Sequence, residues 1–128
     1  MVNLDTTFLV DFLHGVPSAV ERFQRLESDR AVICVCAPAA SEVMVGAAAG
    51  EERHRRAAED LLGALNWLEF DWESCVLAGR IGAELSRRGE PLSAPDLFIA
   101  AISLRHHHPL LTQDRAFSRV PGLSVETY

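Results

Sequence analysis

Residues 92–117, LSAPDLFIAAISLRHHHPLLTQDRAF, decide the fold predicted for this chain. Ser93 and Asp96 fit an S-x-x-D capping pattern with Pro95 in the first turn, which predicts the start of a helix. The residues that follow are apolar around most of the helix, as in a central helix: Leu97, Ile99, Ala100, Ala101, Ile102 and Leu104. A turn at Pro109 then leads into a short buried strand at 110–112, with Asp114 just beyond it. Acidic residues therefore stand where a helix begins and where a strand ends.

Short apolar strands and amphipathic helices alternate along the rest of the chain. The apolar runs predict strands at 1–4, 31–36, 67–70 and 123–127. Helices are expected at 8–14, 51–65 and 74–88. Another helix is expected to start at Pro17 and Ser18, where Ser18 and Glu21 form an S-x-x-E capping box. A further helix is expected after Pro38, which ends the second strand, and it extends to about residue 49. No hairpin signals separate the strands, so the pattern predicts a three-layer α/β/α domain with a central, mostly parallel sheet. Residues 1–128 read as a single domain.

The charged residues exclude several classes of function. The chain has 128 residues and a formal net charge of −6, which argues against broad, nonspecific wrapping of nucleic acid but not against a local contact. All 12 basic residues other than histidine are arginine. Because there is no lysine, P-loop, Schiff-base and kinase chemistry are excluded.

Cysteine, histidine and hydropathy patterns add no cofactor site or membrane segment. The three cysteines form no C-x-x-C pair, and they are expected to be buried, reduced thiols. Three consecutive histidines at 106–108 do not converge easily on one zinc ion, so they are interpreted as a polar turn. No apolar run approaches the roughly 20 residues that span a bilayer, and the N-terminus lacks a basic region. We therefore expect a cytoplasmic protein.

Four acidic residues are predicted to reach one rim of the sheet, because ligands of open parallel sheets bind outside the carboxyl ends of the strands. Asp5 ends the first strand, Glu42 follows the second, and Asp96 and Asp114 flank the strand at 110–112. Crowded carboxylates raise each other's pKa and favour a bound cation. An all-oxygen site suits Mg²⁺ or Mn²⁺ rather than zinc.

Each of these residues also has a purely structural interpretation. Asp5 and Asp114 are suitable helix caps, Asp96 is the capping partner of Ser93, and Glu42 suits the first turn of a helix. Two hydroxyls are candidates to hold a metal-bound water, or equally to serve in local capping and strand formation: those of Thr6 and Thr112. The residues alone leave both interpretations open.

Four segments resemble PIN-domain ribonucleases of the VapC toxin type, in family order and spacing: LDTTFLVDFLHG (4–15), SEVMVG (41–46), SAPDLFIAAIS (93–103) and PLLTQDRAFSRVPGL (109–123). The resemblance implies a PIN fold, an acidic Mg²⁺ or Mn²⁺ site and endoribonuclease activity, usually on tRNA or rRNA. It also implies a homodimer and inhibition by a cognate VapB-like antitoxin. Carried over residue by residue, Asp5, Glu42 and Asp96 match the core acids. Asp114 matches a position where many such toxins carry asparagine.

Other side chains receive secondary interpretations. Asp11 lies one and a half turns beyond Asp5 and is interpreted as structural. Two arginines beside the acidic rim are candidate phosphate contacts, Arg115 and Arg119. The basic run at 53–56 alternates with acids and predicts an ion-paired helix face. Tryptophan and phenylalanine are expected mostly in the core; a groove for an antitoxin helix lined by Phe8, Phe12 and Trp72 is the alternative.

The favoured hypothesis is metal-dependent hydrolysis of RNA. Carboxylates would hold one or two ions, a bound water would attack phosphorus in line, and the metal would offset charge on the leaving 3′-oxygen. Two alternatives remain: a catalytically silent PIN-like module that binds protein or RNA, and a metal-dependent phosphoesterase acting on another substrate.

Overall fold

A five-stranded sheet in the order β3-β2-β1-β4-β5 lies at the centre of the computed structural model, which describes residues 1–128. The strands are β1 (Val2–Leu4), β2 (Ile33–Cys36), β3 (Asn66–Leu68), β4 (Leu110–Leu111) and β5 (Val125–Glu126). All four pairings between neighbours are parallel. Strands β1, β2 and β4 are fully buried, as expected for a parallel sheet that is covered on both faces.

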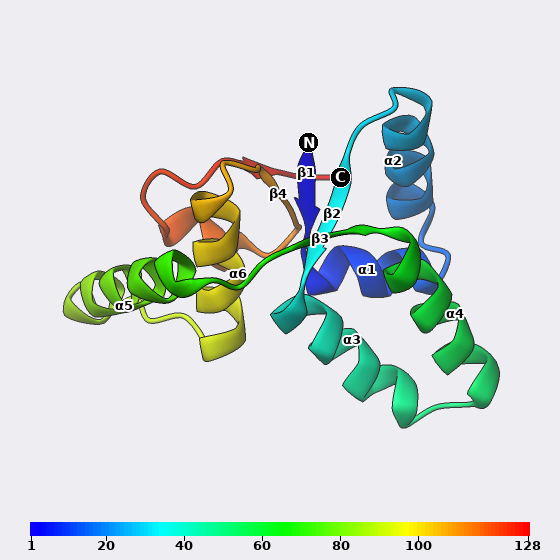
Figure 1. Cartoon of the computed structure of the whole chain (residues 1–128), viewed down its shortest axis with the longest axis horizontal. Helices are drawn as coiled ribbons and strands as arrows, with labels where there is room; N and C mark the ends of the chain where they lie inside the picture. The colour runs from blue at the N-terminus through cyan, green and yellow to red at the C-terminus, as the bar shows by residue number, and fades with distance from the viewer.

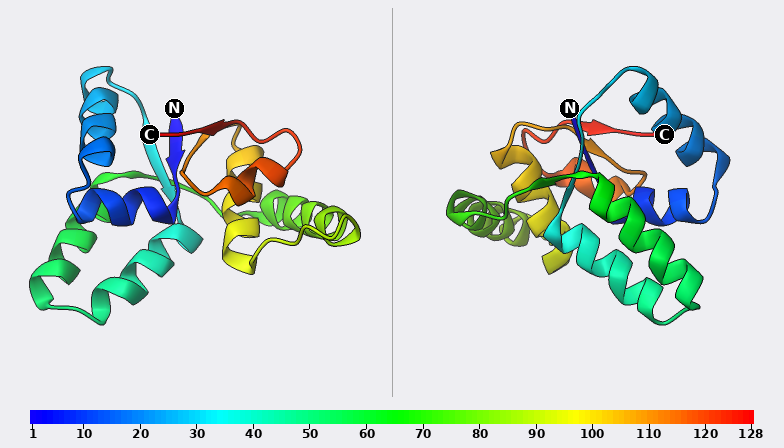
Figure 2. Two further views of the ribbon diagram at one scale, coloured as in Figure 1. Left: turned by 180° about the vertical axis from the view of Figure 1, so that it is seen from behind. Right: turned by 45° about the vertical axis from the view of Figure 1, so that its right-hand side comes forward.

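Helices cover both faces of this sheet, which confirms the three-layer α/β/α prediction. They are α1 (Thr6–Leu13), α2 (Pro17–Ser28), α3 (Ala37–Ala48), α4 (Glu52–Ala64), α5 (Trp72–Arg87), α6 (Ala94–Arg105) and the 3-10 helix η1 (Arg115–Arg119). Helices α5 and α6 lie on one side of the sheet, and α1, α2 and α4 lie on the other (Figure 1). The view from behind shows the same division (Figure 2). Helix α3 starts at the end of β2 and contacts both α4 and α6.

Helix α6 is the central helix that its sequence predicts. Five consecutive residues, from Ile99 to Ser103, are fully buried, so this turn and a half has no solvent-facing side. The one polar side chain among them is satisfied, because the amide of Asn3 in β1 donates to the hydroxyl of Ser103 at 2.8 Å. This bond ties the last turn of α6 to the central strand.

Prolines account for two helix boundaries that differ from expectation. Helix α2 begins at Pro17 with Val16 at the N-cap, so the predicted capping box at Ser18 and Glu21 is wrong: it lies inside the helix. Proline suits the first helical turn, because its fixed φ is helical and the N–H that it lacks has no partner there. Pro38 likewise lies in the first turn of α3, which starts directly after β2 instead of after a break.

The positions of several aromatic side chains differ from those expected from their hydrophobicity. Both tryptophans are exposed, Trp67 by 54% and Trp72 by 74%, so the expectation that they belong to the core is wrong. Phe8 is fully buried, and Phe12 packs against Phe23 with ring centroids 4.5 Å apart. A groove shared by Phe8, Phe12 and Trp72 is therefore not present.

Other expectations from composition fare better. Cys34 and Cys36 are buried free thiols, as predicted, whereas Cys75 is exposed. The basic run on α4 forms the predicted ion-paired face, with Arg53, Arg55 and Arg56 each within 4 Å of a neighbouring glutamate. No helix in the structure is long and apolar enough to cross a bilayer.

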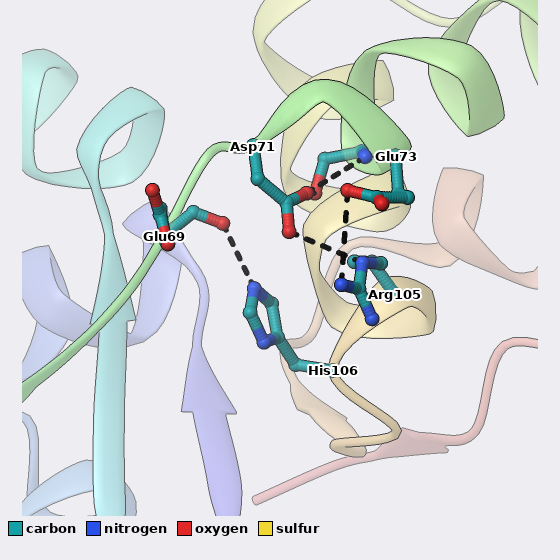
Figure 3. Close-up of polar contacts among 6 residues, drawn as sticks. Glu69, Asp71, Glu73, Arg105 and His106 are labelled. Atoms are coloured by element: carbon teal, nitrogen blue, oxygen red, sulfur yellow. Dashed lines mark hydrogen bonds and ion pairs between the residues drawn. The ribbon is translucent and has the colours of Figure 1, made fainter.

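A cluster of polar contacts, which we call the α5–α6 clamp, fastens the end of α6 to the segment between β3 and α5 (Figure 3). Its members are the backbone carbonyl of Glu69 and the side chains of Asp71, Glu73, Arg105 and His106. The ring Nε2 of His106 lies 2.8 Å from the Glu69 carbonyl, which only accepts, so this nitrogen carries the hydrogen. The Arg105 guanidinium lies 3.1 Å from Asp71 and 3.7 Å from Glu73.

Asp71 also caps α5. Its Oδ1 accepts hydrogen bonds from the backbone N–H of Ser74 at 2.9 Å and from the Ser74 hydroxyl at 2.7 Å. These two bonds, together with the positive charges of Arg105 and His106, lower the pKa of Asp71 below its ordinary value. The ionised form is therefore the one that the folded state prefers.

Replacing Asp71 with asparagine should reduce the loss of stability in acid. A lowered pKa means that the folded state binds fewer protons than the unfolded state, so Asp71 stabilises the fold above the ordinary carboxyl pKa of about 3.9. That stabilisation is lost as the pH falls through the folded-state pKa. Urea unfolding from neutral pH downward should show a shallower decline for Asp71→Asn than for the wild type, and a lower free energy of unfolding at pH 7.

Asp29→Asn is the matched control, because Asp29 is an exposed helix-end residue whose side chain makes no hydrogen bond or ion pair. It should leave the decline unchanged. Parallel curves for Asp71→Asn and the wild type would contradict the role assigned to the clamp.

Candidate active site

Four acidic side chains gather where the order of the strands reverses. The chain steps outward from β1 to β2 and β3, then crosses to the other side of β1 to form β4 and β5. Asp5 follows β1 directly, and Asp114 lies shortly after β4. Asp96 lies in the first turn of α6, and Glu42 lies in α3. In open α/β sheets this switch point forms the crevice in which ligands bind.

Asp5 is the most buried of the four acids, with 2% of its surface exposed. It occupies the N-cap position of α1, but its side chain makes no capping hydrogen bond. Instead, Oδ2 accepts a hydrogen bond from the Thr112 hydroxyl at 2.6 Å and one from the Thr7 hydroxyl at 2.9 Å. Burial raises the pKa of Asp5 above its ordinary value, although these hydroxyls act in the opposite direction. Helix capping therefore does not account for its side chain.

The carboxyl group of Asp96 is affected by the charges of the other three acids. Its backbone N–H donates to the Ser93 hydroxyl at 3.4 Å, which confirms the capping pattern at the start of α6. Burial raises the pKa of the Asp96 carboxyl, and the negative charges of Asp5, Asp114 and Glu42 raise it further. Side chains from three other segments thus lie within electrostatic reach of this carboxylate.

Glu42 and Asp114 each accept a hydrogen bond. The Thr6 hydroxyl donates to Glu42 Oε1 at 2.9 Å, which links the start of α1 to α3. Asp114 Oδ1 accepts from the Ala116 N–H at 2.9 Å, so this residue caps η1, as its structural interpretation expected. Glu42 is exposed and Asp114 is half-buried, so both remain accessible from solvent.

Three threonines orient these carboxylates. Thr6 and Thr112 were singled out from the sequence as possible holders of a metal-bound water, and their hydroxyls donate to Glu42 and Asp5. The Thr112 hydroxyl also accepts from the Asp114 N–H at 2.9 Å, so it joins two of the acids. The role in holding water remains a prediction. Sequence reasoning missed Thr7, whose only signal is its position two residues after Asp5.

The oxygen atoms of the four acids suit a hard divalent cation, although the side chains do not form a closed metal cage. All of the candidate ligands are oxygens. Burial raises the pKa of Asp5 and Asp96, and neighbouring carboxylates raise both further. No group of three or more histidine, cysteine, aspartate or glutamate side chains forms a ready-made metal cage in the structure. The carboxylates would therefore have to turn toward one another when an ion binds. The positive charge of the ion would then offset the repulsion between them.

Other polar side chains lie near the four acids, and from the sequence two of them are candidate phosphate contacts and one has a structural role. Arg115 and Arg119 are exposed on η1 beside Asp114, and neither forms an ion pair; Arg119 donates to the Pro91 carbonyl at 3.2 Å. Asp11 accepts a hydrogen bond from the Tyr128 hydroxyl at 2.6 Å, so it links α1 to the end of the chain. Burial raises the pKa of Tyr128, which keeps this hydroxyl protonated as a donor.

Two hollows open onto the surface beside Glu42. The first, of about 520 Å³, lies where α3, α6 and the segment between β3 and α5 meet, and it is lined by Ala37, Pro38, Ser41, Glu42, Val45, Phe70, Pro95 and Phe98. The second, of about 600 Å³, lies between α1, α3 and α4, and its lining includes Val10, Leu13, Glu42, Val43, Ala47 and His54. Glu42 is the residue that they share.

The chain is similar to several named ribonucleases. It is 27% identical to the tRNA(fMet)-specific endonuclease VapC of Salmonella typhimurium, over 98% of this chain and 96% of that protein. It is 29% identical to ribonuclease VapC2 of Haemophilus influenzae, with the same coverage of both chains.

Solved structures share the fold. A chain in the structure of DNA-bound VapBC from Salmonella typhimurium superposes with a TM-score of 0.88 at 28% identity, covering 99% of this chain and 98% of that one. VapBC2 from Rickettsia felis, bound to a promoter DNA fragment, gives a TM-score of 0.87 at 21% identity, with the same coverage, and supports the fold alone. The family model described as "PIN domain" matches residues 2–123. The chain therefore belongs to the PIN-domain family.

Proposed function

We propose that this protein is a Mg²⁺- or Mn²⁺-dependent endoribonuclease, the toxin of a toxin–antitoxin pair, which hydrolyses phosphodiester bonds in tRNA or rRNA. The observation that carries the proposal is the position of four acids around the switch point of the sheet: Asp5 directly after β1, Glu42 in α3, Asp96 in the first turn of α6 and Asp114 shortly after β4. The similarity to VapC ribonucleases along nearly the whole chain points in the same direction.

The acids would hold the cation, and the surrounding residues would orient them. Asp5, Glu42, Asp96 and Asp114 are the proposed ligands, with Thr112 and Thr7 fixing the direction of the Asp5 carboxylate. A bound Mg²⁺ supplies an activated water and stabilises charge on the departing oxygen. Arg115 and Arg119 are the proposed contacts to a phosphate of the RNA; both residues are exposed, and neither forms an ion pair.

The cognate antitoxin is the proposed partner, and the hollow between α1, α3 and α4 is its proposed site. Its apolar walls suit one face of an amphipathic segment. Because Glu42 also lines this hollow, an occupant would lie beside one of the proposed metal ligands. The proposal also includes a cytoplasmic location, a single catalytic domain over residues 1–128, and a homodimer.

An assay with three substrates separates this proposal from its alternatives. The purified chain is incubated with structured RNA, single-stranded DNA and a small phosphomonoester, each with Mn²⁺ and with EDTA. Mn²⁺-dependent cleavage of RNA supports the proposal. Turnover of the phosphomonoester alone indicates a different phosphoesterase, and RNA binding without cleavage indicates a silent binding module.

Replacing Asp96 with asparagine should lower Mn²⁺-dependent RNA cleavage by more than about 100-fold, because it removes a carboxylate from the ion site while keeping the size of the side chain. Asp60→Asn is the matched control, since Asp60 is exposed on α4 and its side chain makes no hydrogen bond or ion pair. Cleavage should be followed on gels as initial rates.

A stability measurement distinguishes loss of the ion from loss of the fold. A raised pKa means that ionised Asp96 destabilises the metal-free protein at neutral pH, so in EDTA the variant should melt at the same temperature as the wild type or higher. Mn²⁺ should raise the melting temperature of the wild type but not of the variant. Full cleavage activity in Asp96→Asn would remove the assignment.

Replacing Thr112 with valine should lower cleavage by about 10- to 100-fold, the usual cost of losing a partner that orients a metal ligand. It leaves the buried Asp5 carboxylate one donor short and the Asp114 N–H without its acceptor, which should also cost about 1–3 kcal/mol of stability. Thr112→Ser keeps the hydroxyl and should retain most of the activity. Equal rates for the valine and serine variants would show that the hydroxyl plays no part.

A further inference from the structure

The first hollow beside Glu42, formed by Pro38, Val45, Phe70, Pro95 and Phe98, has no role in the site described so far. Its lining is almost entirely apolar, with Ser41 and Glu42 as the exceptions. The Phe70 and Phe98 rings meet in a tilted arrangement with centroids 5.2 Å apart. Phe70 keeps 37% of its surface exposed, so this aromatic pair presents a ring to solvent.

The segment that carries Phe70 is held on both sides. The carbonyl of Glu69, one residue before it, accepts the hydrogen bond from His106, and Asp71, one residue after it, pairs with Arg105. Figure 3 shows both contacts reaching across from the end of α6 to this segment. An exposed aromatic ring that is fixed in this way loses little conformational entropy when a ligand stacks on it.

The hollow is continuous with the acidic rim. Glu42 belongs to both, and Pro95 and Phe98 flank Asp96 in the first turns of α6. On the opposite side of the rim, next to Asp114, stands the exposed guanidinium of Arg115. A nucleic acid strand with one phosphate at the carboxylates would therefore have a cation on one side and an aromatic hollow on the other.

We propose that this hollow is a nucleobase subsite, in which an unpaired base next to the scissile phosphate stacks on Phe70. The proposal rests on the proposed ribonuclease function and adds a determinant of substrate choice. A base reaches the hollow only if it is unstacked and unpaired, so the preferred substrates are loops or single strands instead of duplex RNA. Stacking on an aromatic ring tolerates every base, because each has a π-face.

Binding to fluorescent RNA tests this subsite in protein that does not cleave. In the Asp96→Asn background, a single-stranded RNA containing 2-aminopurine should bind with quenching of the base fluorescence. Adding Phe70→Ala should weaken binding by about 5- to 100-fold, the range expected for one base–aromatic stack. It should also abolish most of the quenching. Phe70→Tyr should retain both, which separates loss of the ring from a disturbed fold.

Trp72→Ala is the matched control, because Trp72 is a more exposed aromatic, two residues further along, that does not line the hollow. It should leave affinity and quenching unchanged. Unchanged binding in Phe70→Ala overturns the subsite. So does an equal loss in Trp72→Ala together with dissociation into monomers in sedimentation, which would mark the surface as an interface between two copies.

The same set of proteins separates this proposal from the parent one. If the wild type cleaves RNA with Mn²⁺ and Phe70→Ala binds RNA as well as its parent, only the subsite is wrong. If the wild type cleaves no RNA under any condition while other substrates turn over, the proposed function itself fails.

Discussion

The hydrogen bond between the Thr112 hydroxyl and the buried carboxylate of Asp5 joins the two strands on which the site depends. Asp5 directly follows β1 and Thr112 directly follows β4, and the order of the strands reverses between these two parallel neighbours. A carboxylate in so buried a place is unfavourable without donors, and the hydroxyls of Thr112 and Thr7 supply them. The acid is kept in place by hydrogen bonding while its charge remains available to a ligand.

The remaining acids follow from that geometry. Parallel strands end at the same edge of the sheet, so the segments that leave β1, β2 and β4 and the start of α6 converge there. Burial raises the pKa of Asp96, and the carboxylates of Asp5, Asp114 and Glu42 raise it further, which is an energetic cost in the absence of a cation. The α5–α6 clamp works at the other end of α6, where it fixes the segment that carries Phe70. Rigid elements thus support both the charged rim and the apolar hollow beside it.

Much of this arrangement could be predicted from the sequence, because it depends on local patterns. Alternating strands and helices predicted the parallel sheet, and the ends of those segments indicated which acids would meet. Contacts between side chains that are distant along the chain could not be predicted from the sequence. For example, nothing near Asp71 in the sequence identifies Arg105 as its partner. Hydrophobicity misplaced Trp67 and Trp72, because β3 is an edge strand and Trp72 begins a helix that projects from the sheet. Proline at the first turn also outweighed the capping signal at Ser18.

The central claim is that Asp5, Glu42, Asp96 and Asp114 lie close enough together to bind a divalent cation, which relieves the repulsion between their carboxylates. Calorimetric titration of Mn²⁺ into the metal-free protein near about pH 5, just above the ordinary carboxyl range, tests it most directly. The account predicts saturable binding with release of protons, seen as a heat that changes between buffers of different ionisation enthalpy. Absence of saturable binding, or binding with no proton release, would contradict it.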